Sequence, residues 1–210
     1  MIEELTKYDQ IFTANNFCGQ VNEEQVFEFT NKNSLVIFSA PHATRSTVSK
    51  KEKLSDSFTG AIASWLKYHS ALSTIIRTKY VSKKNTIYDF VETLNLPQNT
   101  YFLDIHGMKQ EVPFELEIGT GVLPTQLYKK EISIIENLCK KHQISWCLNH
   151  PDYHGTQGFT AQYQKRHKLK NILQLEWRRD MRDFYSFPEN VTKKTIPFLL
   201  ELAKKSNSSP

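Results

Sequence analysis

The sequence is short of cysteine and has no long apolar run. Three cysteines, Cys18, Cys139 and Cys147, are spread over 210 residues, and an odd number at such spacing argues against a disulfide framework. They form no CxxC pair, which argues against a structural zinc held by cysteines. No segment approaches the roughly 18 apolar residues of a membrane-spanning helix. The acidic N-terminal segment MIEELTKYDQ lacks the pattern of a signal peptide, so we expect a cytoplasmic protein that does not bind membranes.

The charge balance gives little support to nucleic-acid binding. The formal net charge is +5, but the lysines are scattered rather than gathered in one basic segment. The sequence also offers no recognition helix and no stacking platform of aromatic residues. We therefore expect a solvated basic surface that helps solubility and attracts anionic substrates. Nucleic-acid binding, with its steep dependence on salt, is the least favoured hypothesis.

Short apolar runs alternate with helical patterns, and the length suits one domain over 1–210 whose last few residues are disordered. The spacing predicts strands over 25–30, 34–39, 73–78, 101–105, 114–119, 144–148 and 171–176, and helices over 56–68, 124–141 and 191–204. We expect Ser55 or Asp56 to cap the first of these helices. The alternation predicts a three-layer α/β/α sandwich with a mixed, largely parallel sheet. The sequence does not indicate the oligomeric state.

Three of the predicted strands end in polar residues. The strand of SLVIFSAPHATR delivers His42, and the strand of YFLDIHG delivers His106, with Asp104 two residues earlier on the same side. The strand of NILQLEWRRD delivers Glu176, a carboxylate that is costly to bury unless it is paired or bound to a metal. Because sites in such sheets form at the carboxyl ends of strands, these side chains are candidates for one site.

Two histidines and a carboxylate are the ligands of a catalytic zinc ion that keeps one position for water. Such an ion lowers the pKa of its water, and a nearby glutamate can take the proton. The HxxE spacing of many zinc peptidases is absent, because Arg45 stands where the glutamate would be. Glu52 and Asp56 are the alternatives for the carboxylate ligand. We favour Asp56, because a helix N-terminus beside the strand end would aim it at the metal.

The segments PHATR, LSDSFTG, DIHG and HGTQGFTAQYQKRHKLKNILQLEWRRDMR, in this order, resemble the N-formylglutamate amidohydrolase family. The resemblance covers about 34–182. It implies an α/β/α fold related to the zinc carboxypeptidases and one zinc ion bound by His42, Asp56 and His106. It also implies that Glu176 is the general base and later the proton donor. Asp104 is then expected to orient a ligating histidine from behind.

The substrate side of the site is less well defined. Arg45 and Arg77 are the candidates for stabilising the negative charge that develops on the carbonyl oxygen. An arginine after Glu176, foremost Arg178, would suit a substrate carboxylate, and His154 lies in a glycine-rich segment expected to be a loop over the site. The expected substrate is an N-acyl amino acid or short peptide bearing a carboxylate. The alternative function is a non-catalytic binding protein with a relic metal site.

Overall fold

The computed structural model describes residues 1–21, 25–48, 51–81 and 86–207. Seven strands form its main sheet, in the spatial order β1-β5-β2-β6-β9-β7-β8. Their bounds are β1 Phe27–Thr30, β2 Val36–Ala40, β5 Ser73–Arg77, β6 Tyr101–Gly107, β7 Leu116–Gly119, β8 Trp146–Leu148 and β9 Ile172–Trp177. The β1–β5 and β7–β9 pairings are antiparallel and the other four are parallel. A small antiparallel hairpin, β3 Ser46–Val48 and β4 Lys51–Lys53, stands beside it.

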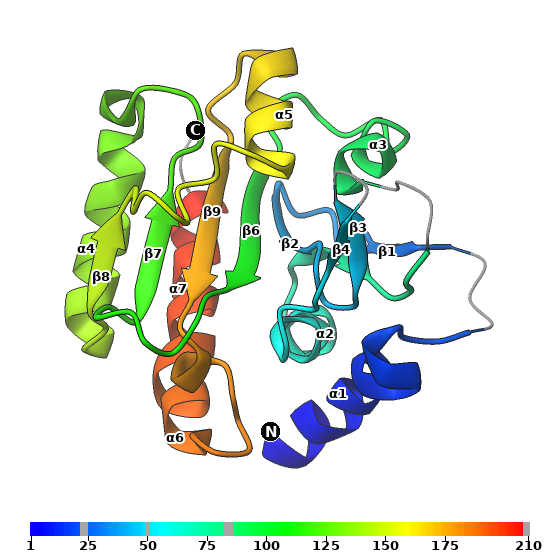
Figure 1. Ribbon diagram of the computed structural model, residues 1–210. Helices are drawn as coiled ribbons and strands as arrows, with labels where there is room; N and C mark the ends of the chain where they lie inside the picture. The colour runs from blue at the N-terminus through cyan, green and yellow to red at the C-terminus, as the bar shows by residue number, and fades with distance from the viewer. Residues whose placement is uncertain (22–24, 49–50, 82–85, 208–210) are drawn as a thin grey trace.

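Helices cover both faces of the sheet, as Figure 1 shows. The bounds of the helices are α1 Ile2–Phe17, α2 Thr59–His69, α3 Ile87–Val91, η1 Thr125–Tyr128, α4 Lys129–His142, α5 Phe159–His167, η2 Arg179–Met181, α6 Pro188–Asn190, η3 Val191–Thr195 and α7 Ile196–Asn207. One face packs against α2, α4 and α7, and the other packs against α3 and α5. The predicted three-layer α/β/α fold with a mixed, largely parallel sheet is confirmed.

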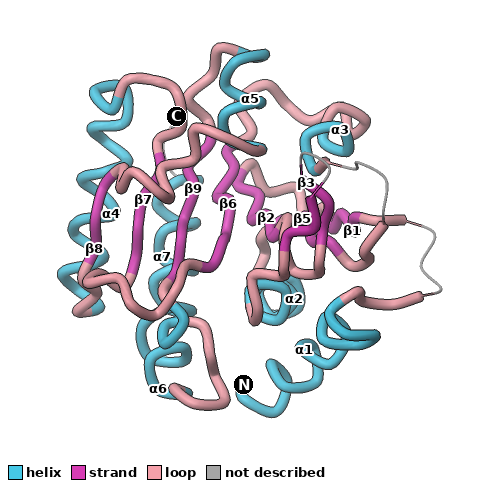
Figure 2. Tube along the Cα trace, in the orientation of Figure 1, coloured by secondary structure: helices cyan, strands magenta, loops and turns pink. Residues whose placement is uncertain are grey.

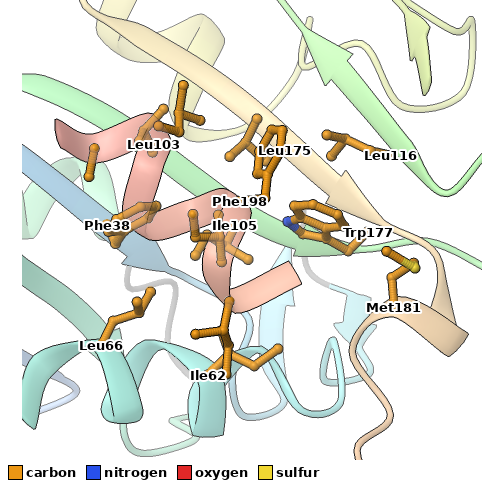
Figure 3. Packing of buried hydrophobic residues seen from close by; sticks show 14 of the residues in the cluster. Phe38, Ile62, Leu66, Leu103, Ile105, Leu116, Leu175, Trp177, Met181 and Phe198 are labelled. Atoms are coloured by element: carbon orange, nitrogen blue, oxygen red, sulfur yellow. The ribbon is translucent and has the colours of Figure 1, made fainter. Parts of the chain in front are cut away.

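The alternation of side chains along the strands separates two cores. On β6, Leu103 and Ile105 point to the α2, α4 and α7 face, where they meet Ile62 of α2 and Phe198 of α7 (Figure 3). Phe102, the residue before Leu103, points to the other face and packs on α5. The first face is apolar along the full length of the strands. On the second face the apolar residues stop part-way, and polar residues occupy the carboxyl ends.

Most predicted elements are present with shifted ends. The helix predicted over 124–141 divides into η1 and α4, and the one predicted over 191–204 begins with a π-helical turn. The elements that were not predicted are the N-terminal helix α1, the β3–β4 hairpin, α3, α5 and the short helices η2 and α6. The prediction of disorder at the chain end falls on 208–210, outside the described residues, and α7 extends to Asn207. No helix in the described part of the chain is long and apolar enough to cross a bilayer.

Candidate metal and active site

Two rows of side chains run across the sheet on the α3 and α5 face. In the first row, Ser39 of β2 lies beside Asp104 of β6, which lies beside Gln174 of β9. In the second row, His106 of β6 lies beside Glu176 of β9. Residues paired across strands point to the same face, so a two-residue repeat on each strand is enough to gather these groups. The sequence spacing DIH on β6 and QLE on β9 produces both rows.

His106 is held between two carboxylates. Its Nε2 is 2.9 Å from Oδ2 of Asp104, and its Nδ1 is 3.1 Å from Oδ2 of Asp56. Asp104 is fully buried and accepts a short hydrogen bond from Ser39 Oγ on its other oxygen. Burial by itself lowers the pKa of His106, but the charges and hydrogen bonds of Asp104 and Asp56 outweigh it and raise that pKa to about 10. Asp104 thus fixes the ring from behind, and Nδ1 points toward the site.

Asp56 reaches the site through the backbone and not as a helix cap. Its N–H donates to the carbonyl oxygen of His42 at 2.8 Å, which places the two residues together. The predicted cap is wrong, because α2 begins at Thr59 after Phe58, and no side chain caps it. The Asp56 carboxylate is therefore free to face His106 and, at 3.6 Å, Nζ of Lys53. Burial raises the pKa of Asp56, but Lys53 and the hydrogen bond from His106 hold it well below its usual range.

His42 follows β2, as the sequence predicts, and its ring centroid is 5.2 Å from that of His106. Its Nδ1 is 3.0 Å from Ser46 Oγ of the β3–β4 hairpin. Desolvation of the ring and the charge of Lys53 hold the pKa of His42 well below its usual value. His42 is therefore a neutral imidazole, the form that coordinates metals.

Glu176 lies on the other side of His106, near the end of β9. Its Oε1 accepts a hydrogen bond of 2.7 Å from Nε2 of Gln174, which also donates to the carbonyl oxygen of Tyr153 at 2.9 Å. Burial raises the pKa of Glu176 to about 7, against the opposing charge of His106. A carboxyl group with a pKa near neutrality is suited to accept and return a proton.

A cavity of about 460 Å³ opens over these residues. His42, His106 and Glu176 line it, together with Lys53 and Arg77. Residues 151–158 form its other wall. They belong to the segment 150–158 that precedes α5, the pocket loop, which passes in front of β7 and β9 (Figure 2). The prediction that the glycine-rich segment forms a loop holds up to Gly158, after which α5 begins. The cavity is thus lined by neutral, acidic and basic side chains that meet at the ends of neighbouring strands.

The predicted substrate-side residues separate into two groups. Arg77 and His154 line the cavity. Arg77 is 3% exposed, donates from Nε to the carbonyl oxygen of Pro41 at 2.8 Å and stacks over the ring of Phe27. Burial lowers the pKa of Arg77 to about 10, so it keeps its charge at neutral pH. Nδ1 of His154 donates a hydrogen bond of 2.9 Å to the carbonyl oxygen of His150 in the pocket loop.

Arg45 and Arg178 are not among the residues that line the cavity. Arg45 pairs through Nη1 with Glu52 at 2.8 Å. Arg178 makes two hydrogen bonds of 2.8 Å with Asp180, so its guanidinium fork is already occupied. Glu52, the alternative carboxylate ligand, is likewise engaged by Arg45.

Sequence reasoning considered Arg182 only as one of the arginines after Glu176 that could bind a substrate carboxylate, and it missed the structural role of this residue. Arg182 is 7% exposed and donates to three backbone carbonyl oxygens, those of Ser57, Met108 and Trp177. Each acceptor is one or two residues from Asp56, His106 or Glu176. Its guanidinium lies against Gly107, where a Cβ would stand 2.5 Å from Cζ. The glycine after His106 was a signal of close approach, but nothing in the sequence identified the approaching group.

The donor types fit a zinc ion. Tetrahedral zinc with bonds near 2.0–2.2 Å holds two ligand atoms roughly 3.3 Å apart, and Nδ1 of His106 is 3.1 Å from Oδ2 of Asp56. Asp104 supplies the carboxylate that commonly orients a ligating histidine. In the part of the chain that the structure describes, however, no three His, Cys, Asp or Glu side chains already form a metal site. His106 must also give up a proton to coordinate a metal.

No family model and no curated protein sequence matches the chain. Solved structures do match. N-formylglutamate amidohydrolase from Ralstonia eutropha JMP134 is 12% identical, with a TM-score of 0.52 over 86% of this chain and 98% of that one. A bacteriophage poly-gamma-glutamate hydrolase is 13% identical, with a TM-score of 0.55 over 88% and 89%. A zinc-free form of YndL is 15% identical, with a TM-score of 0.51 over 88% and 91%.

The chain has the fold of N-formylglutamate amidohydrolase. The resemblance read from the sequence is thereby confirmed for the fold. Coverage is high on both sides of each comparison, so the shared part is nearly the whole of each chain. At 12–15% identity the likeness concerns the fold alone, and the assignment of the site residues rests on the geometry described above.

Proposed function

We propose that the protein is a zinc-dependent hydrolase that cleaves the amide bond of an N-acyl amino acid or a short peptide. The observation that carries the proposal is that His42, His106 and Glu176 line one cavity at the ends of three strands, and that the carboxylate of Asp56 is hydrogen-bonded to His106 beside it. The similar fold of two hydrolases, one acting on N-formylglutamate and one on poly-gamma-glutamate, supports it. A cytoplasmic location stays a prediction from the sequence.

His42, Asp56 and His106 would hold the ion. When bound, zinc supplies Lewis acidity to the amide carbonyl and makes a water molecule more acidic. Asp104 and Ser39 fix the ring of His106, and Lys53 keeps Asp56 ionised.

Glu176 is the proposed general base and, later, the donor of a proton to the leaving amine. Gln174 holds one of its oxygens in place, and the other is available to a water molecule in the cavity. The pKa of about 7 matches both roles, because the group can accept a proton and release it again near neutral pH.

Arg77 is the proposed anchor for a substrate carboxylate. It is buried, charged and at the wall of the cavity, and a guanidinium recognises a carboxylate through paired N–H donors. Its Nε donates to the carbonyl oxygen of Pro41, which fixes the guanidinium at the cavity wall. Lys53 and the chain's net charge of +5 add attraction for an anionic substrate.

The test combines metal analysis with an amine-release assay on N-acyl amino acids and short peptides. We expect the wild type and Glu176→Gln to bind one zinc ion and His106→Ala to bind none, with His167→Ala, outside the cavity, as the matched control. Hydrolysis should fall by about 10²-fold or more in Glu176→Gln. If zinc and substrate bind but Glu176→Gln changes nothing, the site is a relic and the protein is a binding protein.

A further inference from the structure

Glu117 is a fully buried carboxyl group that the proposed chemistry does not use. It lies on β7, directly opposite Glu176 of β9 in the antiparallel pairing, and its exposed fraction is 0%. Side chains paired in this way leave the same face of the sheet with Cβ atoms about 5 Å apart. The second row therefore continues from His106 through Glu176 to Glu117, and the parallel pairing adds Cys147 of β8.

The surroundings of Glu117 do not suit a negative charge. Oε1 accepts the backbone N–H of His150 at 3.2 Å, while Oε2 has no hydrogen-bond partner in the described part of the chain. Among the described residues no lysine or arginine forms an ion pair with it. A buried carboxylate needs several donors or a cation, and here the backbone N–H groups of His150 and Asn149 are opposed by burial and by a second carboxyl group alongside.

The titratable groups that face Glu117 come from its own row, from the neighbouring strand β8 and from the pocket loop. Glu176 and His106 lie in the same row, Cys147 lies on the neighbouring strand, and His150 follows at the start of the pocket loop. Burial first, and then the charge of Glu176, raises the pKa of Glu117 to about 8. At neutral pH the group is therefore mainly the neutral acid.

We propose that Glu117 is a positioning residue for Glu176, present as a neutral carboxylic acid that joins the base on β9 to the start of the pocket loop. The inference rests on the proposed function, because it takes Glu176 as the base. While Glu117 is neutral, Glu176 can lose its proton and keep its hydrogen bond with Gln174, because no second negative charge lies next to it. When Glu117 loses its proton, two carboxylates stand opposite each other and the buried charge disturbs the loop held through His150.

The decisive experiment needs no substrate and no metal. Infrared spectra of the metal-free protein, from pH 5 to pH 10, follow the carbonyl band of protonated carboxyl groups. In the difference between wild type and Glu117→Gln, we expect a band that is present at pH 7 and disappears with a midpoint near pH 8. In a Glu176→Gln background the midpoint of Glu117 should fall, since the like charge beside it is gone. Glu136→Gln, an exposed glutamate of α4, is the control and should leave the band unchanged.

A missing band at pH 7, or a midpoint that Glu176→Gln does not move, overturns the proposal whether or not the protein hydrolyses anything. If the infrared band behaves as expected but the wild type hydrolyses neither N-acyl amino acids nor short peptides, the proposed function is refuted instead. Where hydrolysis is measured, the alkaline fall of kcat/KM should move to higher pH in Glu117→Gln. Glu117→Leu, which cannot accept from His150, should lower kcat at every pH. An alkaline fall left in place by Glu117→Gln would mean a packing role only and would also overturn the proposal.

Discussion

Replacing Arg182 tests whether its hydrogen bonds to the backbone hold the site together. Its guanidinium donates to the carbonyl oxygens of Ser57, Met108 and Trp177, and hydrogen bonds to a charged group contribute about 1.5–3 kcal/mol each. Such contributions are not additive, and methionine retains part of the packing. We therefore expect Arg182→Met to lower the free energy of unfolding by about 4 kcal/mol. This is a large share of the roughly 5–15 kcal/mol typical of a domain.

Urea unfolding of the metal-free protein, followed by tryptophan fluorescence and circular dichroism, measures this loss. Arg179→Met is the matched control, because Arg179 is 61% exposed and its guanidinium pairs with Asp183 at 3.4 Å. It should change stability by less than about 1 kcal/mol. Arg182→Lys should fall between the two, since an ammonium group cannot reach three carbonyls at once.

The same variants report on the site. Because Arg182 ties the segments that carry Asp56, His106 and Glu176, Arg182→Met should weaken zinc binding more than Arg179→Met under conditions where both proteins are folded. If Arg182→Met is as stable as Arg179→Met and binds zinc equally well, the three hydrogen bonds do not support the site, and the reasoning is wrong.

Three further predictions concern the buried acid of α1, the cavity and the core. Burial first, and the charge of Asp183, raise the pKa of Asp9 from 3.8 to about 6, so its contribution to stability is present below about pH 4 and lost as the pH rises through 6. Asp9→Asn should therefore gain about 3 kcal/mol over wild type between pH 3 and pH 8, and parallel urea titrations with no such divergence would contradict this. Arg77→Met should raise KM for a carboxylate-bearing substrate at least tenfold, whereas Arg178→Met should leave KM unchanged; equal effects would remove Arg77 as the anchor. Leu103→Ala, in the core of the opposite face, should cost about 2–5 kcal/mol in unfolding free energy without altering zinc stoichiometry, and altered stoichiometry would show that the two faces are coupled.

The sequence by itself determined the fold class and the residues that arrive at the strand ends. Continuous apolar runs such as 34–39 are typical of strands buried on both faces, and the two-residue repeat places Asp104 and His106, or Gln174 and Glu176, on one side. These signals are local, because strand periodicity depends on neighbouring residues alone. They were sufficient to predict the sandwich and to nominate His42, His106 and Glu176.

Only the tertiary structure decided which of the remaining groups face the cavity. The spacing of Asp56 suited a helix cap, yet the hydrogen bond from its backbone to His42 turns the carboxylate into the site. Arg45 and Arg178 are near site residues in the sequence, but each forms an ion pair with a neighbouring carboxylate and neither lines the cavity. The position of Glu117 beside Glu176 depends on the order of the strands in the sheet. The position of Arg182 depends on its hydrogen bonds to segments that are far apart in the sequence. Such pairings depend on which strands become neighbours, and that choice is made by burying the whole core rather than by any local pattern.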